Sequence, residues 1–424
     1  MSHDRLVIVG AGQAGFEVAT RLRANGFQGS VTLVGDEREI PYQRPPLSKA
    51  YLTENDDESL ALRPEAYYAD HGIDLRCGRA VVTIDRSDRR VELAGGEVLG
   101  YHHLVLATGA RNRPLPVPGT KNAGVHHLRT VDDARGLLDA LNRCESLAVV
   151  GAGFIGLEVA AAARKRGITV TVFEAFDRVM ARAVSTPMSE YFAAEHARHG
   201  VDIRMNATVE EILGVDGRVT GVRTSDGQVT PADVVVIGIG VIPNSDLAAR
   251  AGLPAANGIV VDHHLRTPDP HIWAVGDCAV FPCRDAGEQV RLESVQNAVD
   301  QARCVAAQIM GAEARYAQIP WFWSEQFESK LQIAGLMRDY TSYVTRGSIA
   351  DRSFSIFCFR SDRLVAVESV NAARDHLAAR KILASDMPLT PEQAADDDID
   401  LKAAVKHHQA TRTPAGICSA PSIG

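Results

Sequence analysis

The sequence predicts an α/β fold that combines two Rossmann-like dinucleotide-binding domains with an α+β C-terminal domain built on an antiparallel sheet. The glycine pattern G-x-G-x-x-G occurs twice, as Gly10-Ala11-Gly12-Gln13-Ala14-Gly15 and as Gly151-Ala152-Gly153-Phe154-Ile155-Gly156. Each copy directly follows a short apolar run, which is the context of a strand that enters a nucleotide-binding turn. From Ile319 onward, aromatic and β-branched segments such as residues 354–359 and 364–370 predict antiparallel strands.

The first glycine pattern lies in a predicted βαβ unit. Residues 6–9 are typical of a buried parallel strand, residues 16–24 of an amphipathic helix and residues 31–34 of a second strand. In such a unit the first glycine allows a tight turn, the second lets the backbone approach a pyrophosphate, and the third lets the helix pack on the strand. The second strand ends at Asp36 and Glu37, where a ribose diol needs an acceptor.

The second glycine pattern repeats this arrangement. Residues 147–150 predict a strand, residues 157–166 a helix, and residues 169–173 a second strand that ends at Glu174. A single G-x-G-x-x-G also occurs in ordinary turns, but two copies in the same context favour two bound nucleotides. In each, the pyrophosphate would lie at a helix N-terminus, where unpaired N–H groups and the helix dipole favour negative charge.

The remaining segments predict how the two units are connected. A polar, proline-rich segment covers residues 40–49, and Pro114, Pro116 and Pro118 predict a linker. Three further strands end in Ala107-Thr108-Gly109, in Gly238-Ile239-Gly240 and in Gly276-Asp277, and residues 294–310 predict a helix.

Composition narrows the class of protein. At 424 residues the chain is long enough for two or three domains, and no apolar run approaches the roughly 20 residues that span a bilayer. The first strand begins by residue 6, which leaves no room for a signal peptide, so a cytoplasmic protein is expected. Seven scattered cysteines without a CxxC motif do not indicate a disulfide framework. The net charge of −8 argues against general nucleic-acid binding, and adjacent histidine pairs lack a metal-ligand pattern, so no metal site is predicted.

On these motifs the chain resembles the flavoproteins with two dinucleotide-binding domains, and among them the putidaredoxin reductase-like, oxygenase-coupled NADH-dependent ferredoxin reductases. The resemblance extends from Val7 to about Lys402. Its carriers also include Arg44-Pro45-Pro46-Leu47-Ser48-Lys49, Glu293-Ser294-Val295 and Pro320-Trp321-Phe322-Trp323-Ser324. It implies an FAD domain over residues 1–112 and 243–318, an inserted NADH domain over residues 113–242, and a C-terminal domain over residues 319–424 that covers the flavin.

The resemblance also implies which residues hold non-covalent FAD. Asp36 would lie near the adenosine ribose and Val81 near the adenine, Asp277 would accept from a ribityl hydroxyl, and the Val295 backbone N–H would face the N1/O2 edge of the flavin. Lys49 would lie near flavin N5, paired with Glu158, and would support hydride transfer without an obligatory acid or base. The implied FAD set is Gly10, Gly12, Ala14, Gly15, Asp36, Arg44, Lys49, Val81, Ala107, Thr108, Gly109, Arg129, Gly276, Asp277, Val295 and Trp323.

For the nicotinamide nucleotide, the resemblance implies that Phe154 covers the flavin and moves aside. Glu174 would accept from the ribose 2′-hydroxyl and repel a 2′-phosphate, which favours NADH. Arg178 and Arg182 lie downstream and keep NADPH open as the alternative. The implied NADH set is Gly151, Gly153, Phe154, Ile155, Gly156, Glu158, Glu174, Arg182 and Gly240.

The electron acceptor is inferred from what the flavin-side segment lacks. Related reductases carry one or two reactive cysteines there, whereas residues 41–49 contain none. Cys278 and Cys283 follow Gly276-Asp277, in the wrong part of the fold for that role. The sequence lacks a cysteine cluster for its own iron–sulfur centre, so electrons would leave the flavin for an external acceptor. The resemblance implies that this acceptor is a [2Fe-2S] ferredoxin that supplies a haem monooxygenase or ring-hydroxylating oxygenase. The alternatives are a reductase of rubredoxin, quinone or peroxide, and a redox-responsive binding protein.

Docking of an acidic ferredoxin requires a local basic patch on this acidic chain. By the resemblance, that patch lies around the exposed flavin edge and contains Arg63, Arg303 and Lys402. A lysine of the family is Gln332 here, and Lys330 would take its place.

Overall fold

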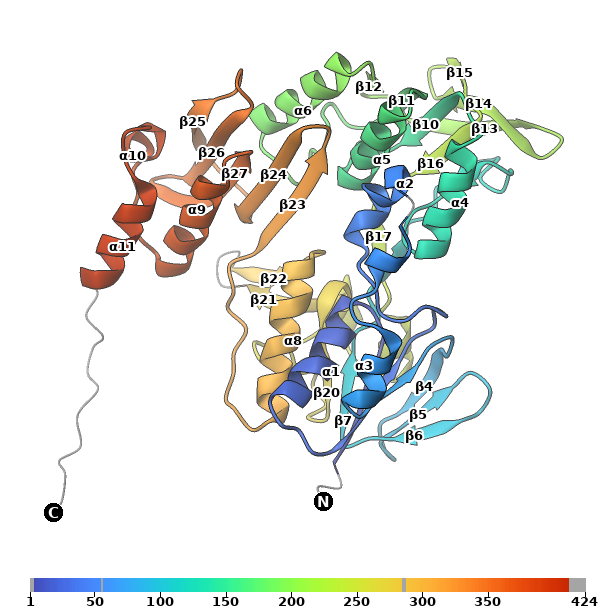
Figure 1. The fold of residues 1–424 in the computed structure, drawn as a ribbon, viewed down its shortest axis with the longest axis vertical. Helices are drawn as coiled ribbons and strands as arrows, with labels where there is room; N and C mark the ends of the chain where they lie inside the picture. Colours follow the sequence, from blue (N-terminus) through green and yellow to red (C-terminus); the bar gives the residue numbers. More distant parts are fainter. Residues whose placement is uncertain (1–3, 55, 284–286, 412–424) are drawn as a thin grey trace. The chain divides into compact units, whose positions relative to one another are not determined.

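The structure is a computed structural model of the chain that describes residues 4–54, 56–283 and 287–411. It divides into two compact units, one of residues 1–318 with Ser324–Glu328 and one of Ile319–Trp323 with residues 329–424 (Figure 1). Of the helices in the described ranges, none combines the length and the apolarity that a membrane span requires.

The first unit contains two five-stranded parallel sheets of the same design. One has the order β20-β7-β1-β2-β3 and the other the order β12-β11-β10-β16-β9. In each sheet the strand before the glycine pattern lies between two parallel neighbours, so the backbone groups of the central strand are paired on both sides. The strands are β1 (Arg5–Val9), β2 (Ser30–Val34), β3 (Ile73–Arg76), β7 (His103–Leu106), β20 (Ile272–Ala274), β9 (Val125–His126), β10 (Ser146–Val150), β11 (Thr169–Phe173), β12 (Asp202–Arg204) and β16 (Val234–Ile237).

The second sheet is inserted between two strands of the first, because all its strands fall between β7 and β20 in the chain. The chain leaves through β8 (Ala110–Asn112) and returns through β17 (Val241–Pro243), and these two strands pair antiparallel. The smaller sheets are β4 (Val81–Asp85) with β5 (Arg90–Leu93) and β6 (Val98–Gly100), β13 (Val209–Val215) with β14 (Arg218–Thr224) and β15 (Val229–Pro231), and β18 (Ala255–Ala256) with β19 (Gly258–Val260), β21 (Ala279–Cys283) and β22 (Glu288–Val290).

The helices of the first unit confirm the predicted βαβ units, but two of them begin earlier than predicted. The helix after each glycine pattern begins three residues earlier than the apolar periodicity predicted, because Gly12 and Gly153 are the N-caps and the pattern supplies the first turn. α1 and α8 lie side by side (Figure 1). The helices are α1 (Gln13–Ala24), α2 (Tyr51–Glu54), α3 (Glu65–Asp70), α4 (Val131–Leu141), α5 (Phe154–Lys165), α6 (Thr186–Arg198), α7 (Asp246–Arg250) and α8 (Val295–Ile309).

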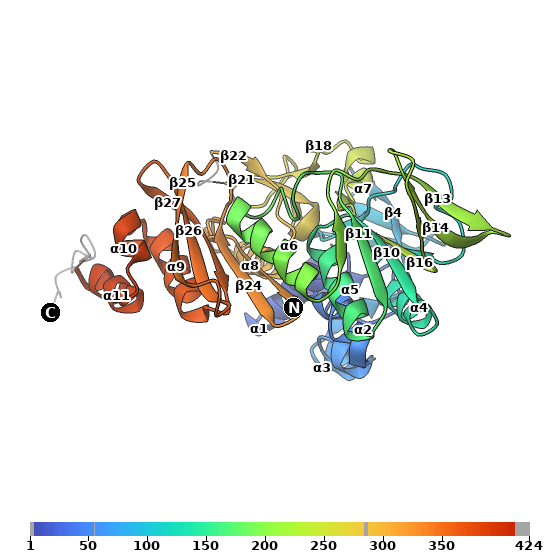
Figure 2. The same ribbon diagram turned by 90° about the horizontal axis from the view of Figure 1, so that it is seen from above.

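The second unit confirms the predicted antiparallel sheet, with the order β23-β24-β27-β26-β25. Its helix α9 packs on β24 and β27, and α11 packs on α9 (Figure 2). Phe357, Phe359, Ile382 and Leu401 belong to the buried core between sheet and helices. The elements are β23 (Trp321–Gln326), β24 (Ser329–Gly335), β25 (Ser342–Ser348), β26 (Ser353–Arg360), β27 (Arg363–Val370), α9 (Ala373–Ser385), α10 (Pro391–Ala395) and α11 (Leu401–Thr411).

Candidate functional site

In the first glycine pattern, two glycines are required by the packing of the protein and the third leaves backbone exposed. Gly10 has φ +112°, and a Cβ atom there would lie 2.1 Å from the Ala107 carbonyl oxygen. A Cβ at Gly15 would lie 1.9 Å from the Gly10 carbonyl oxygen. By contrast, a Cβ at Gly12 would meet no atom within 4 Å. The protein's own packing therefore requires Gly10 and Gly15, whereas Gly12 keeps an open face above the start of α1.

The second pattern has the same division. Gly151 has φ +103°, and a Cβ there would lie 2.6 Å from the Gly238 carbonyl oxygen. A Cβ at Gly156 would lie 2.1 Å from the Gly151 carbonyl oxygen, while one at Gly153 would meet nothing within 4 Å. The first unit thus has two such turns, and each exposes its backbone at the second glycine of its pattern.

The two helices that follow these glycines begin without a side-chain cap. Neither Gly12 nor Gly153 supplies a cap, and neither first turn contains an acidic residue. In contrast, the serine and threonine side chains that precede α4, α6 and α8 each accept a backbone N–H of their helix. The N–H groups at the starts of α1 and α5 are therefore left for a ligand, and their positive dipole ends suit a pyrophosphate. Both sites fit a dinucleotide by this test.

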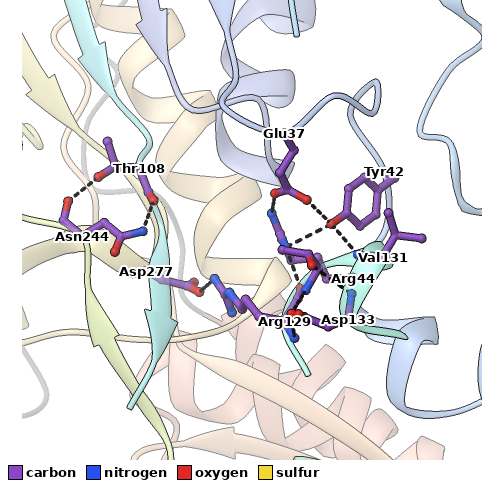
Figure 3. A network of polar contacts seen from close by, with 10 residues as sticks. Glu37, Tyr42, Arg44, Thr108, Arg129, Val131, Asp133, Asn244 and Asp277 are labelled. Carbon is purple, nitrogen blue, oxygen red and sulfur yellow. Dashed lines mark hydrogen bonds and ion pairs between the residues drawn. The ribbon is translucent and has the colours of Figure 1, made fainter. Parts of the chain in front are cut away.

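A polar network surrounds the first site (Figure 3). Arg44 forms an ion pair with Glu37 and donates from Nη1 to the Arg129 carbonyl oxygen at 2.6 Å. The Tyr42 hydroxyl donates to Glu37 at 2.5 Å and accepts from the Val131 backbone N–H at 3.1 Å. Burial raises the pKa of Tyr42, which keeps the hydroxyl protonated as that donor. Glu37 is thus committed to holding Arg44, while Asp36 is exposed at the end of β2.

Asp277 is placed at the first site by a turn that contacts the glycine pattern. Gly276 has φ +77°, and a Cβ there would lie 3.1 Å from the Ala14 Cβ. Asp277 Oδ2 accepts from Arg129 Nη2 at 2.9 Å. Arg129 in turn precedes α4, whose capping box fixes the backbone at that position through Asp133. The structure therefore brings together Ala14, Gly276, Asp277, Arg129 and Arg44, which the sequence places far apart.

Two residues of this region were not among the predicted site residues. Tyr42 joins Glu37, Arg44 and the start of α4, and Asn244 forms two hydrogen bonds with Thr108: Asn244 Nδ2 donates to the Thr108 carbonyl at 2.9 Å, and Thr108 Oγ1 donates to the Asn244 carbonyl at 2.6 Å. Asn244 directly follows Pro243, the last residue of β17. Its reciprocal bonding shows that it fastens the returning chain to the Ala107-Thr108-Gly109 segment (Figure 3).

Lys49 and Glu158 form the predicted pair between the two sites. Lys49 Nζ lies 2.7 Å from Glu158 Oε2, and the side chains are 16% and 1% exposed. The same carboxylate oxygen accepts from Ser48 Oγ at 2.5 Å. Because Lys49 follows the turn Pro45–Ser48 and Glu158 lies on α5, this pair connects the proline-rich segment to the second glycine pattern. The contact confirms the pairing, while the role beside a flavin stays a prediction.

Glu174 directly follows β11 beside the second site and is 8% exposed. Its Oε2 accepts from the Ala152 backbone N–H at 2.7 Å and its Oε1 from the Phe176 N–H at 3.0 Å. The two downstream arginines differ. Arg178 donates to the carbonyls of Ala181 and Val184, at 2.5 and 2.9 Å. Arg182 is exposed, and its Nη2 lies 3.5 Å from the position of a Cβ at Gly240.

The cysteines of the described residues are free. Cys278 is fully buried, and burial raises the pKa of its thiol, so it stays protonated and unreactive. Cys283 lies on β21. Cys418 lies outside the described residues.

The other predicted residues take the following places. Ala107 is buried, Val81 opens β4 and Val295 opens α8. Phe154 is the first residue of α5, with exposed Ile155 next to it. Trp323 belongs to the second unit, as do Lys330 and Lys402, whereas Arg63 and Arg303 belong to the first. All four predicted docking residues are exposed.

Comparison with known proteins places the chain in a family. Residues 4–302 match the family described as pyridine nucleotide-disulphide oxidoreductase, and residues 321–405 match the family described as reductase C-terminal. The chain belongs to the pyridine nucleotide-disulphide oxidoreductase family. It is 60% identical over 407 residues to rhodocoxin reductase of Rhodococcus erythropolis, across 96% of this chain and 95% of that protein.

Two solved structures have the same fold. The ferredoxin reductase for the CYP199A2 system from Rhodopseudomonas palustris aligns with a TM-score of 0.93 and 50% identity, over 95% of this chain and 100% of that one. The covalent putidaredoxin reductase–putidaredoxin complex aligns with a TM-score of 0.94 and 42% identity, over 97% of this chain and 100% of that one. These matches confirm the predicted family and fold class.

Proposed function

We propose that the chain is an FAD-dependent oxidoreductase that passes electrons from NADH to a [2Fe-2S] ferredoxin, which supplies a haem monooxygenase or ring-hydroxylating oxygenase. The observation that carries the proposal is the pair of uncapped helix starts at Gly12 and Gly153. The Lys49–Glu158 ion pair, which connects the proline-rich segment to α5, supports it. The names of the relatives, a rhodocoxin reductase and a ferredoxin reductase of a cytochrome system, support the acceptor class.

Residues of the first site would hold FAD non-covalently, and residues of the second would bind NADH. When bound, FAD would supply the chemistry that takes up a hydride and passes on its electrons one at a time. The protein's part would be to bind and orient: the starts of α1 and α5 would hold the two pyrophosphates, Asp277 and Arg129 lie at the first site, and Lys49 is held against Glu158. We assign residues 1–112 and 243–318 to FAD and residues 113–242 to NADH, in a cytoplasmic enzyme.

The acceptor is tested by turnover with a panel. With NADH as donor, the purified enzyme is expected to reduce [2Fe-2S] ferredoxins much faster than rubredoxin, quinone or peroxide. Faster turnover with rubredoxin, quinone or peroxide would identify that compound, and not ferredoxin, as the acceptor. Rapid NADH binding without turnover on the whole panel would support the redox-responsive binding protein instead.

Cysteine variants test whether electrons leave the flavin directly. Cys278→Ser and Cys283→Ser are expected to retain NADH-driven ferredoxin reduction within about twofold of the wild type, since the buried Cys278 thiol is held protonated. Steady-state rates of the folded variants check this. A loss of turnover in either folded variant would indicate that electrons pass through a cysteine pair.

Glu174 is expected to set the preference for NADH over NADPH. Glu174→Ala removes a carboxylate directly after β11. It is expected to lower the ratio of kcat/KM for NADH to kcat/KM for NADPH by about tenfold, which corresponds to the loss of one charged hydrogen bond. Glu210→Ala, which removes an exposed carboxylate from β13, is the control and should leave the ratio unchanged. A wild-type enzyme that prefers NADPH would contradict the assignment.

Arg303 is expected to steer the ferredoxin. Its side chain is 51% exposed on α8, and it lies 3.2 Å from Asp300 and 3.4 Å from Glu17. A glutamate at position 303 would therefore stand beside two other carboxylates, with no positive charge among the three. Arg303→Glu is expected to slow association with ferredoxin about tenfold at low salt, and less when salt screens the charges. Arg143→Glu, at a 77% exposed arginine, is the control. Equal slowing of the NADH step would show that Arg303 is not a docking residue.

A further inference from the structure

A line of buried hydrogen bonds continues from Glu158 on the side opposite to Lys49. Ser324 Oγ donates to Glu158 Oε1 at 2.6 Å, and Gln326 Nε2 donates to Ser324 Oγ at 3.1 Å. His196 Nε2 lies 2.9 Å from Gln326 Oε1. Glu158 is 2% exposed and the other three residues are fully buried. The line joins α5, the segment Ser324–Glu328 and α6, all within the first unit.

The direction of each bond in this line is fixed by chemistry. An ionised carboxylate only accepts, so the Ser324 hydroxyl donates its proton to Glu158 and accepts from the Gln326 amide. The Gln326 carbonyl oxygen then accepts from the Nε2–H of His196. Burial lowers the pKa of His196 to about 4, so at neutral pH the ring is neutral and carries one proton. His196 Nδ1, the other ring nitrogen, has no hydrogen-bond partner among the described residues, and in this tautomer it carries a lone pair rather than a proton.

The segment Ser324–Glu328 is fastened to α6 beside this line. The Phe327 ring stacks on His199 with centroids 3.7 Å apart and meets His196 edge-on at 5.0 Å. Glu328 Oε2 lies 3.2 Å from His199 Nε2. These contacts hold the amide of Gln326 within reach of His196. Buried polar groups generally stabilise a protein no more than apolar packing of the same volume, but a fully hydrogen-bonded line restricts its members to one arrangement. Here the group that it restricts is the carboxylate of Glu158.

We propose that Ser324, Gln326 and His196 are positioning residues that hold Glu158, and through it Lys49, in the orientation that hydride transfer from NADH requires. The proposal rests on the proposed function. Ser48 and Lys49 fix one carboxylate oxygen, and Ser324 fixes the other, so the plane of the carboxylate is set from both sides. Loss of the Ser324 hydroxyl frees Glu158 Oε1 directly, whereas loss of the Gln326 amide or of His196 leaves the Ser324 hydroxyl without the bonds that orient it. In either case the carboxylate that holds Lys49 is less firmly fixed.

Three variants break the line at successive links. Ser324→Ala removes the donor to Glu158, Gln326→Met removes the amide, and His196→Leu removes the donor to the amide. In single-turnover mixing with NADH, each is expected to lower the limiting rate of flavin reduction about tenfold and to leave the NADH dissociation constant within about twofold. The double variant Ser324→Ala with Gln326→Met is expected to be no slower than either single variant, because both break one line.

Two matched variants separate positioning from packing. Ser189→Ala removes a buried hydroxyl from α6 that bonds the Val179 carbonyl outside this line, and it should retain the wild-type limiting rate. His196→Gln supplies an amide donor to Gln326 and should restore most of the rate that His196→Leu loses.

The outcomes are distinct. Wild-type rates in both Gln326→Met and His196→Leu would overturn the proposal and leave the proposed function standing. An equal loss in Ser189→Ala would overturn it as well, since the effect would then be general packing. If NADH fails to reduce the wild-type flavin, the proposed function itself falls, and the proposal falls with it.

Discussion

Gly153→Val is expected to weaken NADH binding about a hundredfold or more while the folded protein keeps its FAD. Gly153 has φ −77°, which valine adopts readily, and a Cβ there meets no protein atom within 4 Å. The added side chain would instead fill the open face where a pyrophosphate approaches the start of α5. Losing about two charge-assisted hydrogen bonds amounts to about 3 kcal/mol, or an NADH dissociation constant raised about a hundredfold or more. Titration of NADH against the flavin spectrum measures it.

Gly156→Val, three residues later in the same pattern, is the control. A Cβ at Gly156 would lie 2.1 Å from the Gly151 carbonyl oxygen, so this variant is expected to lower the thermal unfolding temperature and the yield of folded protein. Unchanged NADH affinity in folded Gly153→Val would show that the open face at Gly153 is not the NADH site.

Asp277→Ala is expected to lower FAD affinity about tenfold or more. Asp277 lies at the first site through the contact of Gly276 with Ala14, and its carboxylate holds Arg129 at 2.9 Å. The substitution removes the acceptor for a ribityl hydroxyl and releases Arg129, and a tenfold change corresponds to about 1.4 kcal/mol. Equilibrium binding of FAD to the apoprotein, followed by flavin fluorescence, gives the affinity.

An ion-paired aspartate elsewhere serves as the control for Asp277. Asp246 pairs with Arg111 at 3.0 Å and is 64% exposed, so Asp246→Ala removes an equivalent pair at the surface. It should leave FAD affinity unchanged. If Asp277→Ala binds FAD as tightly as the wild type, Asp277 is not the ribityl acceptor.

The sequence predicted those parts of the site that depend on local backbone requirements. Gly10 and Gly151 need positive φ, and Gly15 and Gly156 need the absence of a Cβ, so the glycine spacing alone reports the strand, turn and helix. The helix starts were placed too late because each predicted helix began after the last glycine of its pattern, whereas the last three residues of the pattern already belong to the first turn.

Contacts between distant segments were beyond prediction from local pattern. Tyr42 meets the start of α4 some ninety positions later, and Asn244 meets Thr108 across the whole inserted sheet. Nothing in the sequence near Gln326 or His196 indicates that they meet each other. Lys49 and Glu158 were paired only through resemblance to a family, because neither spacing nor composition connects residues so far apart.

Rapid mixing in two steps tests whether electrons pass from NADH through the flavin to a ferredoxin. The purified enzyme is first mixed with one equivalent of NADH, without oxygen, while the flavin absorbance is followed; an oxidised [2Fe-2S] ferredoxin is then added. We expect loss of the oxidised-flavin absorbance in the first step, and its return in the second as about two ferredoxins are reduced per flavin. A flavin that NADH does not reduce, or one that stays reduced in the presence of every ferredoxin tried, would rule out an NADH-dependent ferredoxin reductase.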